Sequence, residues 1–554
     1  MKSLDGIKFA EMVEAGSRHL SQNAEYVDSL NVFPVPDGDT GTNMNLSMTS
    51  GAKETAAHKT ESIGNTAQAL SKGLLMGARG NSGVILSQLF RGFGKAVEKE
   101  DTLDSIKFAQ ALKHGVDTAY KAVMKPVEGT ILTVARVAAE KAVEVAEHEQ
   151  DIRVVMEETL TAAKEALAQT PEMLPVLKEV GVVDSGGQGL VFVYEGFTAV
   201  LKGEEIPTAT VVESLDDLVN AEHHKAQDFM DTSEIVYGYC TEFMVRFEEG
   251  KKPFDEESFR NDMSKFGDSL LVISDDEVVK IHVHSETPGE VISYGHQYGS
   301  LVKIKVDNMR LQHTAIVGED HPQGDTKKAA EKEVKKHPYA IVTVAMGEGV
   351  ARLLESIGAS YVIEGGQTMN PSTEDIVNAV KKVGAEKVLI LPNNKNIVMA
   401  AEQAAELLDI EAAVVPTKTI PQGLAAVLAF NPDQTVEENK KHMANASTNV
   451  KSGQITFAVR DTTIDGIEIH KDDFMAINEG SIIQATPSLK VASELLLSDM
   501  IDEESEIVTV LYGEDIKKET ADELVHFIEE KYPDVEVEVH NGKQPLYPYI
   551  FSVE

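Results

Sequence analysis

Residues 1 to about 200 carry a single pattern, in which apolar side chains recur every three or four positions between Gly, Pro and short polar turns. This period is that of an α-helix with one apolar face. Such helices must bury these faces against one another, so residues 1–202 are predicted to form an all-α bundle or barrel whose end loops are free to carry chemistry. The segments that follow the pattern are 7–20, 67–76, 84–97, 106–123, 131–146 and 154–168.

From residue 233 onwards apolar and polar positions alternate, which is typical of strands with one buried face. These strands flank a helical stretch near 256–266 and predict a small α+β domain over residues 229–312. The acidic, polar segment 203–228 before it is predicted to be a linker. The four strand-like segments are 237–247, 269–273, 278–284 and 301–306.

Residues 338–554 contain an internal repeat. A strand-like run at 341–344, followed by Gly-Glu, recurs at 507–510, and each copy leads into a helical stretch and a second strand. Two related β-loop-α-β halves are therefore predicted within an α/β domain, whose remaining strands continue a parallel order. The charged stretch 313–337, rich in Lys and Glu, is predicted to be a connection.

Several polar loops of this α/β domain follow predicted strands. Loops at the carboxyl ends of parallel strands are where doubly wound sheets bind ligands, which makes 347–349 and 393–396 candidates. The loop 367–373 is polar and stiffened by Pro371, so it is suited to displaying its side chains to a ligand or partner. Taken alone, its sequence favours an ordinary connection between two elements.

The composition narrows the possible functions. The chain has 554 residues, of which 42% are apolar and 26% charged, as expected of a folded protein with roughly three domains. Its net charge of −40 argues against a nucleic-acid partner, because binding phosphate backbones needs clustered Lys and Arg. Neither a run of 18 apolar residues nor a signal-peptide pattern occurs, and the single Cys240 fits a reducing compartment. We therefore expect a cytoplasmic protein without a transmembrane segment.

A short run after two prolines holds a candidate metal site. Asp37 and Asp39 flank Gly38 in a tight turn, so two carboxylates converge. Hard oxygen ligands of this kind suit Mg²⁺, which usually bridges one or two carboxylates to substrate phosphates. A plain Asp-Gly turn is the alternative for these three residues taken alone.

A second candidate segment comprises Gly80, Asn81, Ser82 and Gly83, just before the helix predicted from Val84. Free backbone N–H groups and the helix dipole at such a place face an anion, whereas the plain alternative makes Ser82 an N-cap. Together with the two aspartates, the segment predicts one site in which carboxylates hold a metal and amides hold phosphates.

Four segments in the same order resemble the nucleotide-binding subunit of the dihydroxyacetone kinases. Within that superfamily, the sequence of residues 31–44 and the length of the chain resemble those of the catalytic A component of bacterial fatty acid kinase. This resemblance extends over the whole chain. Residues 338–554 resemble the fold of DegV-like lipid-binding proteins. The four segments are Asp-Gly-Asp-Thr-Gly at 37–41, Arg-Gly-Asn-Ser-Gly at 79–83, Gly-Thr-Ile-Leu at 129–132 and Val-Asp-Ser-Gly-Gly at 183–187.

The resemblance implies that the helical barrel binds ATP with two Mg²⁺ ions, held by Asp37 and Asp39 as the catalytic residues. The relatives place a third Asp before this pair, whereas this chain offers Asn31 or, one helical turn earlier, Asp28. We favour Asn31, a neutral ligand that leaves the metal site one charge short. The residues implied to bind the nucleotide are Thr40, Thr42, Asn43 and Met44, which would close the loop, then Gly80, Asn81, Ser82 and Gly83, and finally Thr130, Asp184 and Gly186.

The same resemblance implies transfer of the ATP γ-phosphoryl group to the carboxylate of a fatty acid, giving an acyl phosphate for phospholipid synthesis. A separate DegV-like binding protein presents the acid, so residues 338–554 would dock this carrier without a lipid pocket of their own, and a homodimer is implied. A carboxylate is already anionic at pH 7, so no general base is assigned. Arg79 either steadies the transferring group or, as we favour, lies on the surface. The alternatives are a nucleotide-binding regulatory scaffold and a dihydroxyacetone-kinase-type phosphotransferase subunit.

The predicted α+β domain holds a possible Zn²⁺ site. Side chains two apart on a strand share a face, so His282 and His284 project together. Cys240 would meet them if its strand is a neighbour, and water or Glu242 would complete the ligand set. The alternative is a pair of histidines on a polar surface and a buried structural thiol.

Overall fold

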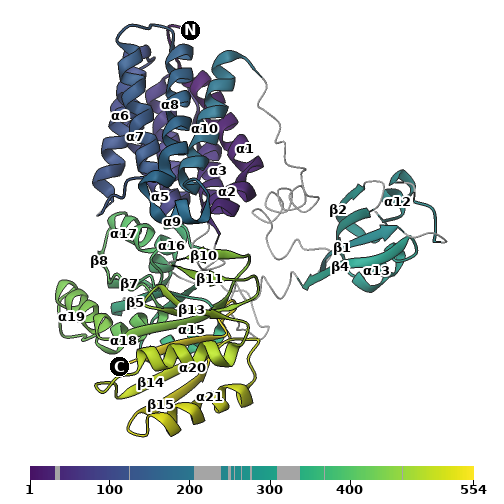
Figure 1. Cartoon of the computed structure of the whole chain (residues 1–554). Helices are drawn as coiled ribbons and strands as arrows, with labels where there is room; N and C mark the ends of the chain where they lie inside the picture. The colour runs from purple at the N-terminus through teal and green to yellow at the C-terminus, as the bar shows by residue number, and fades with distance from the viewer. Residues whose placement is uncertain are drawn as a thin grey trace, which may run out of the picture. The chain divides into compact units, whose positions relative to one another are not determined.

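The structure is a computed structural model of the chain (Figure 1). It divides into two compact units. One unit joins Met1–Thr208 to Glu333–Glu554, and the other is the segment Ala209–Lys332, which is inserted between these two parts. The residues that the structure describes are 1–31, 38–123, 125–204, 239–247, 251–254, 256–263, 265–274, 278–308, 337–366, 369–464 and 466–554.

The first part of the larger unit is helical, which confirms the class predicted from the apolar period. Its helices pack side by side (Figure 1) around one core, in which Phe9 stacks on Phe93 with ring centroids 5.2 Å apart. We call this part the helical bundle. Its helices are α1 (Gly6–Gln22), α2 (Ala24–Leu30), α3 (Thr40–His58), α4 (Ile63–Gly77), α5 (Gly80–Val97), α6 (Ser105–Ala122), α7 (Ile131–Ala146), α8 (Ile152–Met173), α9 (Pro175–Val180) and α10 (Ser185–Lys202).

Helix α3 was not predicted, because its packing face is built from small and polar side chains instead of a regular apolar stripe. A Cβ at Gly41 would lie 2.0 Å from the Ala24 carbonyl oxygen, so α2 and α3 approach closely there. Ser47 and Thr55 are buried and donate hydrogen bonds to carbonyls of their own helix. The expectation that residues 40–44 close a loop is therefore replaced: they form the start of α3.

A parallel four-stranded sheet, in the order β6-β5-β7-β8, opens the remaining part of this unit, which we call the α/β part. All three strand pairings are parallel, as the predicted α/β order requires. The elements are β5 (His337–Ala345), α15 (Glu348–Ser356), β6 (Tyr361–Glu364), α16 (Thr373–Val383), β7 (Ala385–Leu391), α17 (Val398–Glu406), β8 (Glu411–Val414), α18 (Ile420–Leu428) and α19 (Val436–Thr448).

A mixed six-stranded sheet, in the order β13-β12-β9-β16-β14-β15, follows, and its only parallel pair is β14 with β15 among the described strands. The antiparallel strands and a separate hairpin, β10-β11, were not predicted. The elements are β9 (Lys451–Phe457), β10 (Thr462–Ile464), β11 (Ile467–Ile469), β12 (Phe474–Asn478), β13 (Ser481–Thr486), α20 (Leu489–Met500), β14 (Ile507–Tyr512), α21 (Lys518–Lys531), β15 (Glu536–Asn541) and β16 (Tyr549–Val553).

The predicted repeat is present as two parallel β-α-β units, β5-α15-β6 and β14-α21-β15, but the two units belong to different sheets. The loop after β5 meets the loop after β15. The Val350 N–H donates to the Gly542 carbonyl at 3.1 Å, and Lys543 Nζ lies 2.8 Å from the Glu348 carboxylate. The repeat therefore joins the two sheets of the α/β part.

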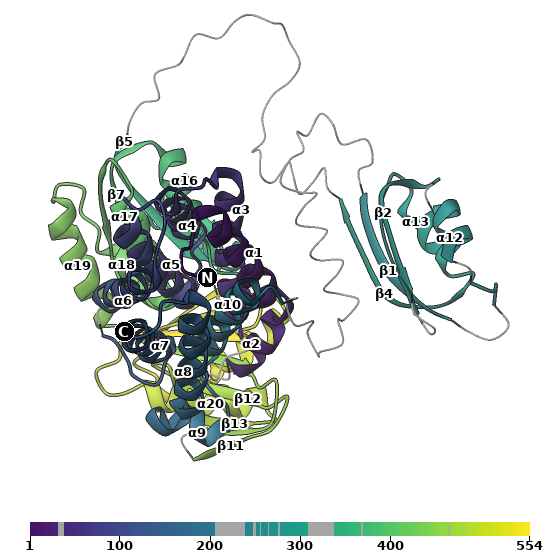
Figure 2. The same ribbon diagram turned by 90° about the horizontal axis from the view of Figure 1, so that it is seen from above.

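The inserted unit is an antiparallel sheet in the order β2-β3-β1-β4, with two helices on one of its faces (Figure 2). Phe243 on the sheet and Phe259 and Val291 on the helices share one core. This confirms the predicted α+β class, although the second helix was not predicted. The elements are β1 (Tyr239–Phe247), α12 (Glu256–Met263), β2 (Gly267–Ser274), β3 (Val278–Ser285), α13 (Pro288–Gly295) and β4 (Gly299–Asn308).

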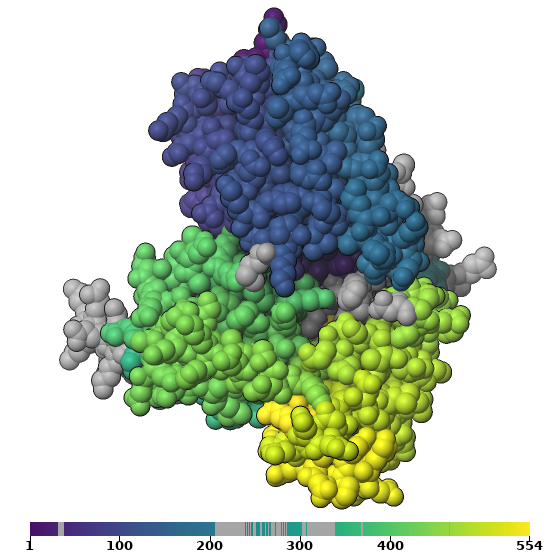
Figure 3. Space-filling model, turned by 60° about the vertical axis from the view of Figure 1, so that its left-hand side comes forward, coloured from purple at the N-terminus to yellow at the C-terminus, as the bar shows by residue number. Residues whose placement is uncertain are grey.

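Within the larger unit, the parallel sheet and its helices pack against one end of the helical bundle, which Figure 3 shows as green surface directly against blue. Ala78 and Val84 belong to the same buried cluster as Val377 and Ala400. The Thr373 N–H donates to the Ala78 carbonyl at 3.1 Å. The loops of the α/β part therefore lie beside the helix ends that hold the predicted nucleotide motifs.

Candidate functional site

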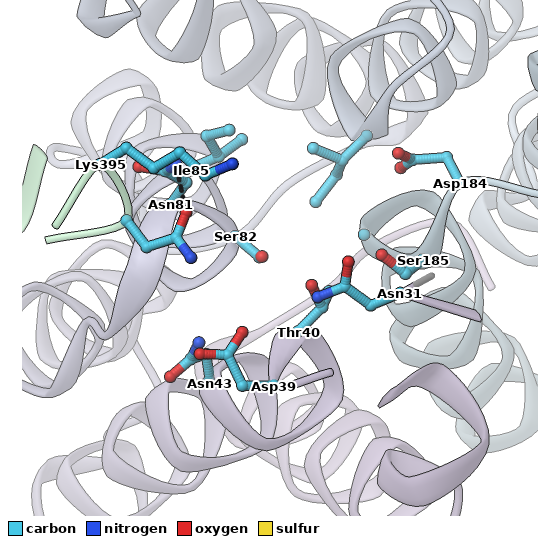
Figure 4. Close-up of a pocket in the computed structure, with 13 residues that line it drawn as sticks. Asn31, Asp39, Thr40, Asn43, Asn81, Ser82, Ile85, Asp184, Ser185 and Lys395 are labelled. Atoms are coloured by element: carbon cyan, nitrogen blue, oxygen red, sulfur yellow. Dashed lines mark hydrogen bonds between the residues drawn. The ribbon is translucent and has the colours of Figure 1, made fainter. Parts of the chain in front are cut away.

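A pocket of about 200 Å³ lies where several helix ends of the bundle meet the α/β part. Figure 4 shows Asp184 on one side, Asn81 and Lys395 on the opposite side, and Asp39 and Asn43 between them at the base. Most of the lining groups are carboxylates, amides and hydroxyls, which suit a charged ligand. The lining residues are Asn31, Asp39, Thr40, Asn43, Asn81, Ser82, Ile85, Ile131, Asp184, Ser185, Gly186, Lys395 and Asn396.

The start of α3 supplies one wall of the pocket. Asp39 is the N-cap residue of this helix and is only 7% exposed. Thr40 and Asn43, three residues apart on one helix face, both line the pocket. Thr42 and Met44 do not line the pocket: Thr42 is exposed, and Met44 is fully buried in the core. The structure therefore corrects the expectation that these two side chains close a loop around the nucleotide.

Asn31 and Asp28, the two candidates for a third metal ligand, occupy different environments. Asn31 lines the pocket. Asp28 Oδ1 accepts hydrogen bonds from the N–H groups of Gly41 at 2.6 Å and Thr42 at 3.1 Å, and Thr42 Oγ1 donates to Asp28 Oδ2 at 2.7 Å. Burial raises the pKa of Asp28, and these hydrogen bonds oppose the rise. Asp28 thus anchors the start of α3, which leaves Asn31 as the candidate ligand.

Helix α5 begins at Gly80 instead of near Val84, so the glycine-rich segment is its first turn. Arg79 is the N-cap residue, and Ser82 is not. Gly80 has a φ of 57°, and a Cβ there would lie 2.6 Å from Asn43 Nδ2, so a larger residue does not fit. The first N–H groups of a helix have no acceptor within it and carry the positive end of its dipole. This turn therefore suits a phosphate, and its binding of one stays a prediction.

Asp184 faces that helix start from the opposite wall. It is the N-cap residue of α10, and its carboxylate accepts from the Gly187 N–H at 2.6 Å. Loss of contact with water raises the pKa of the Asp184 carboxyl to about 6, although the N–H groups of Gly187 and Ile131 lower it. Among the described residues, no basic side chain contributes to this shift. The pocket therefore carries a negative charge that a bound cation would offset.

The other predicted nucleotide contacts have different outcomes. Gly186 lines the pocket. Thr130 caps α7 with its hydroxyl, and the neighbouring Ile131 lines the pocket in its place. Gly83 is the residue of the first turn of α5 whose N–H already donates within the helix, at 3.1 Å. Asp37 lies outside the described residues, so its proposed role stays a prediction.

The α/β part supplies a group from the polar loop 367–373, which its sequence alone favoured as an ordinary connection. Asn370 is 1% exposed, and its Nδ2 donates to Asp39 Oδ2 at 2.5 Å. Arg79 Nη1 donates to the Asn370 carbonyl at 2.9 Å, and Arg79 Nη2 lies 3.3 Å from the Asp375 carboxylate. Arg79, for which we favoured a plain surface position, thus connects the helical bundle to the α/β part.

A second loop, after β7, brings Lys395 and Asn396 to the pocket. Asn81 Nδ2 donates to Asn396 Oδ1 at 3.3 Å, so this loop contacts the first turn of α5. The position of residues 393–396 after a parallel strand marked them as a candidate binding loop. Nothing in the sequence paired them with the glycine-rich segment, because only the packing of the two parts brings them together.

The predicted Zn²⁺ ligands lie on paired strands of the inserted unit. In the antiparallel register of β1 and β3, Cys240 pairs with His284 and Glu242 with His282. Their side chains lie outside the described residues. Among the side chains that are described, no group of three or more His, Cys, Asp or Glu is arranged to hold a metal. The Zn²⁺ site stays a prediction, and metal analysis of the wild type against Cys240→Ala tests it.

Comparison with protein families defines the class of protein. A DAK2 domain matches residues 34–199, which contain the helices around the pocket. The middle domain of a family described as similar to the A component of fatty acid kinase matches residues 236–316, and the C-terminal domain of the same family matches residues 340–554. The class is therefore that of kinases with a DAK2-type helical domain.

Two full-length relatives make the assignment narrower. Protein YloV of Bacillus subtilis strain 168 is 60% identical over 100% of both chains, and an uncharacterised protein of Staphylococcus aureus strain USA300 is 53% identical, also over 100% of both. The chain belongs to the FakA-like family, that of the fatty acid kinase A component. A solved DegV family protein, Cg2579 from Corynebacterium glutamicum, matches 39% of this chain and 96% of its own at 14% identity, with a TM-score of 0.30. Within the described ranges, every helix is too short or too polar to span a bilayer.

Proposed function

We propose that this protein is the ATP-using component of a fatty acid kinase, which transfers the γ-phosphoryl group of ATP to the carboxylate of a fatty acid. The observation that supports the proposal is one pocket that gathers Asp39, Asp184 and the starts of α5 and α10, in a chain of this family. Carboxylates that hold a metal and helix starts that hold phosphates are the parts that phosphoryl transfer uses.

The donor atoms of the pocket fit Mg²⁺. Asp39 offers a carboxylate, and Asn31 and Asn43 offer amide oxygens, all of them the hard ligands that this ion prefers. Asp37 would complete the set for two ions. When bound, Mg²⁺ would neutralise charge on the phosphoryl oxygens.

In the proposed reaction, a carboxylate oxygen of the fatty acid attacks the γ-phosphorus in line. The new P–O bond forms as the bond from the γ-phosphorus to the bridging oxygen breaks, and the electron pair stays on ADP. The acceptor is ionised near pH 7, so no protein group has to remove a proton from it. The N–H groups at the starts of α5 and α10 would hold the phosphate chain during the transfer.

We propose that a second protein presents the acid. The cavity beside the carboxyl ends of β5 and β7, lined by Met346, Asn394 and Tyr547 among others, has a volume of about 30 Å³. A cavity of this size does not enclose an acyl chain. We propose that a DegV-like fatty-acid-binding protein carries the acid and that residues 338–554 help to dock it.

Incubating the purified protein with ATP, Mg²⁺, oleate and a DegV-like carrier tests the proposal. We expect ADP and acyl phosphate in equal amounts, the latter trapped with hydroxylamine, and no acyl phosphate when the carrier is omitted. Tight ADP binding without acyl phosphate, whichever carrier is used, would favour the regulatory scaffold. Phosphorylation of dihydroxyacetone in place of the fatty acid would favour the dihydroxyacetone-kinase-type reading of the chain.

A further inference from the structure

We propose that the α/β part completes the phosphotransfer site. Lys395 is a catalytic residue that binds the terminal phosphoryl group, and Asn370 is a positioning residue that holds Asp39. This inference rests on the proposed function in one respect, namely that the pocket binds ATP. It gives residues 338–554 a chemical role in addition to the docking of a carrier.

The wall contributed by the helical bundle brings acids to the pocket but no base among the described residues. Its charged groups are Asp39 and Asp184. Lys395 is the one basic side chain in the described lining, and it comes from the α/β part. A transferring phosphoryl group needs fixed positive charge around its oxygens in addition to metal ions. Lys395 is placed to supply that charge.

The lining of the pocket indicates which end of the nucleotide Lys395 contacts. Asp39 and Asp184 supply carboxylates, which suit metal ions, and the first turn of α5 supplies N–H groups, which suit a phosphate. These groups therefore surround the reacting end of ATP, and Lys395 is one of them.

The backbone on both sides of Lys395 is fixed by side-chain hydrogen bonds. Asn393, buried and with a φ of 54°, donates from Nδ2 to Thr343 Oγ1 on β5 at 2.7 Å. Asn394 is also buried, and its Oδ1 accepts from the Asn396 N–H at 2.8 Å. A cation acts on a transition state most strongly when its support is already ordered, because no reorganisation is then needed. The loop meets that requirement.

The Lys395 loop is also tied to the helix start that suits a phosphate. Asn396 Oδ1 accepts from Asn81 Nδ2 at 3.3 Å, and Asn81 lies in the first turn of α5. Figure 4 shows Lys395 next to Asn81 and across the pocket from Asp184. An ammonium group there would contact the same phosphate oxygens as the N–H groups of this turn.

Asn370 restrains Asp39 without lining the pocket itself. Its Nδ2 donates to Asp39 Oδ2 at 2.5 Å, and Arg79 Nη1 holds the Asn370 carbonyl at 2.9 Å. Asn370 does not itself line the pocket, so it acts through Asp39. Hydrogen bonds of this kind orient metal ligands, and losing them typically costs tenfold or more in metal affinity.

Equilibrium binding to the full-length protein in Mg²⁺ tests the role of Lys395. ADP and the non-hydrolysable analogue AMP-PNP are titrated into wild type, Lys395→Gln, Lys395→Arg and the control Lys418→Gln. Lys418 is exposed, follows the neighbouring strand β8 and does not line the pocket. We expect Lys395→Gln to weaken AMP-PNP binding at least roughly tenfold while ADP stays within about twofold. Lys395→Arg should recover part of the loss, and Lys418→Gln should match wild type.

Two results would overturn the role of Lys395: an equal loss for ADP and AMP-PNP, or no loss for either. A wild type that binds AMP-PNP but forms no acyl phosphate would contradict the proposed function and leave this test valid. A wild type that binds neither nucleotide would contradict both the role of Lys395 and the proposed function.

The Mg²⁺ dependence of AMP-PNP binding tests Asn370. We expect Asn370→Ala to raise the Mg²⁺ concentration needed for half-maximal binding roughly tenfold. The matched control is Gln403→Ala, because Gln403 Nε2 donates to Ser87 Oγ at 3.4 Å between the same two parts, away from the pocket. The control should keep the wild-type Mg²⁺ dependence. An equal shift in both variants would mean that Asn370 only stabilises the packing of the two parts, and the positioning role would be refuted.

Discussion

The two walls of the pocket come from parts of the chain that present their chemistry differently. The helical bundle presents Asp39, Asn81 and Asp184 at the starts of helices, each within a short motif. The α/β part presents Lys395 and Asn396 to the pocket, and Asn370 to Asp39, from loops that no motif marks. One wall brings acids and N–H groups, and the other brings a cation and a neutral amide. A motif thus reveals a group that helix geometry directs into a site, but not one that the packing of two parts directs there.

The largest expected effect on activity comes from replacing Asp39, on the wall of the pocket that the helical bundle supplies. Asp39→Ala removes the proposed metal ligand, and we expect acyl phosphate formation to fall at least about 10³-fold. It also leaves the buried Nδ2 of Asn370 without its acceptor, which costs roughly 1–3 kcal/mol of stability. Single-turnover assays with a carrier, together with thermal melts, measure both effects.

Asp39→Asn separates the two effects. An amide oxygen keeps an acceptor for Asn370 but removes the negative charge, so this variant should be as inactive as Asp39→Ala and closer to wild type in stability. Activity within tenfold of wild type in a folded sample of either variant would contradict the assignment of the metal to this wall.

Replacing Asp184, on the same wall of the pocket, is expected to change how the free energy of unfolding depends on pH. Its pKa is raised to about 6 in the folded protein, against about 3.9 in an unfolded chain. Folding therefore favours the protonated form, so the stabilising contribution is full below about pH 4 and is lost as the pH rises through about 6. Over that window, metal-free wild type should lose up to roughly 3 kcal/mol of stability relative to Asp184→Asn.

Urea denaturation in EDTA at several pH values measures this difference. Asparagine at position 184 keeps an oxygen that accepts from the Gly187 N–H, which makes it a matched replacement. A difference in stability that stays constant from about pH 4 to pH 7 would contradict the raised pKa.

The smallest expected effects distinguish Asp28 from Asn31 within the same wall. Asp28→Ala removes the acceptor of three hydrogen bonds at the start of α3, so we expect a loss of about 1–2 kcal/mol in stability with little change in Mg²⁺ affinity. Asn31→Ala should weaken Mg²⁺ binding several-fold and leave stability unchanged. Thermal melts and Mg²⁺ titrations check both variants. The reverse pattern would make Asp28 the ligand.

The apolar periods predicted the classes of all three folded parts because each class buries its faces with a regular spacing. They failed at α3, whose packing depends on the absence of side chains at Gly41 and on polar residues such as Ser47 that bond within their own helix. Met44 was misplaced for the same reason. Once residues 40–44 are helical, Met44 lies one turn further from the start of α3 than Thr40 and packs into the core.

The candidate site was predictable as far as its groups are close in sequence. Asn81, Ser82 and Gly186 came from contiguous motifs and line the pocket. Asn370 and Asp39 are 331 positions apart, and their contact depends on how one folded part packs on another. No periodicity or turn signal encodes such a distance. Lys395 belongs to the same category, although its loop was a candidate from its place after a parallel strand.

The order of the parts along the chain has a consequence for synthesis on the ribosome. The pocket needs residues from Asn31 to Asn396, and the whole inserted unit is made in between. At 5–20 residues per second, the stretch from Asp184 to Lys395 takes roughly 10–40 s to translate. During that interval the nascent bundle has its acids but not Lys395, so from the role proposed for Lys395 we expect that an unfinished polypeptide does not yet transfer the phosphoryl group of ATP.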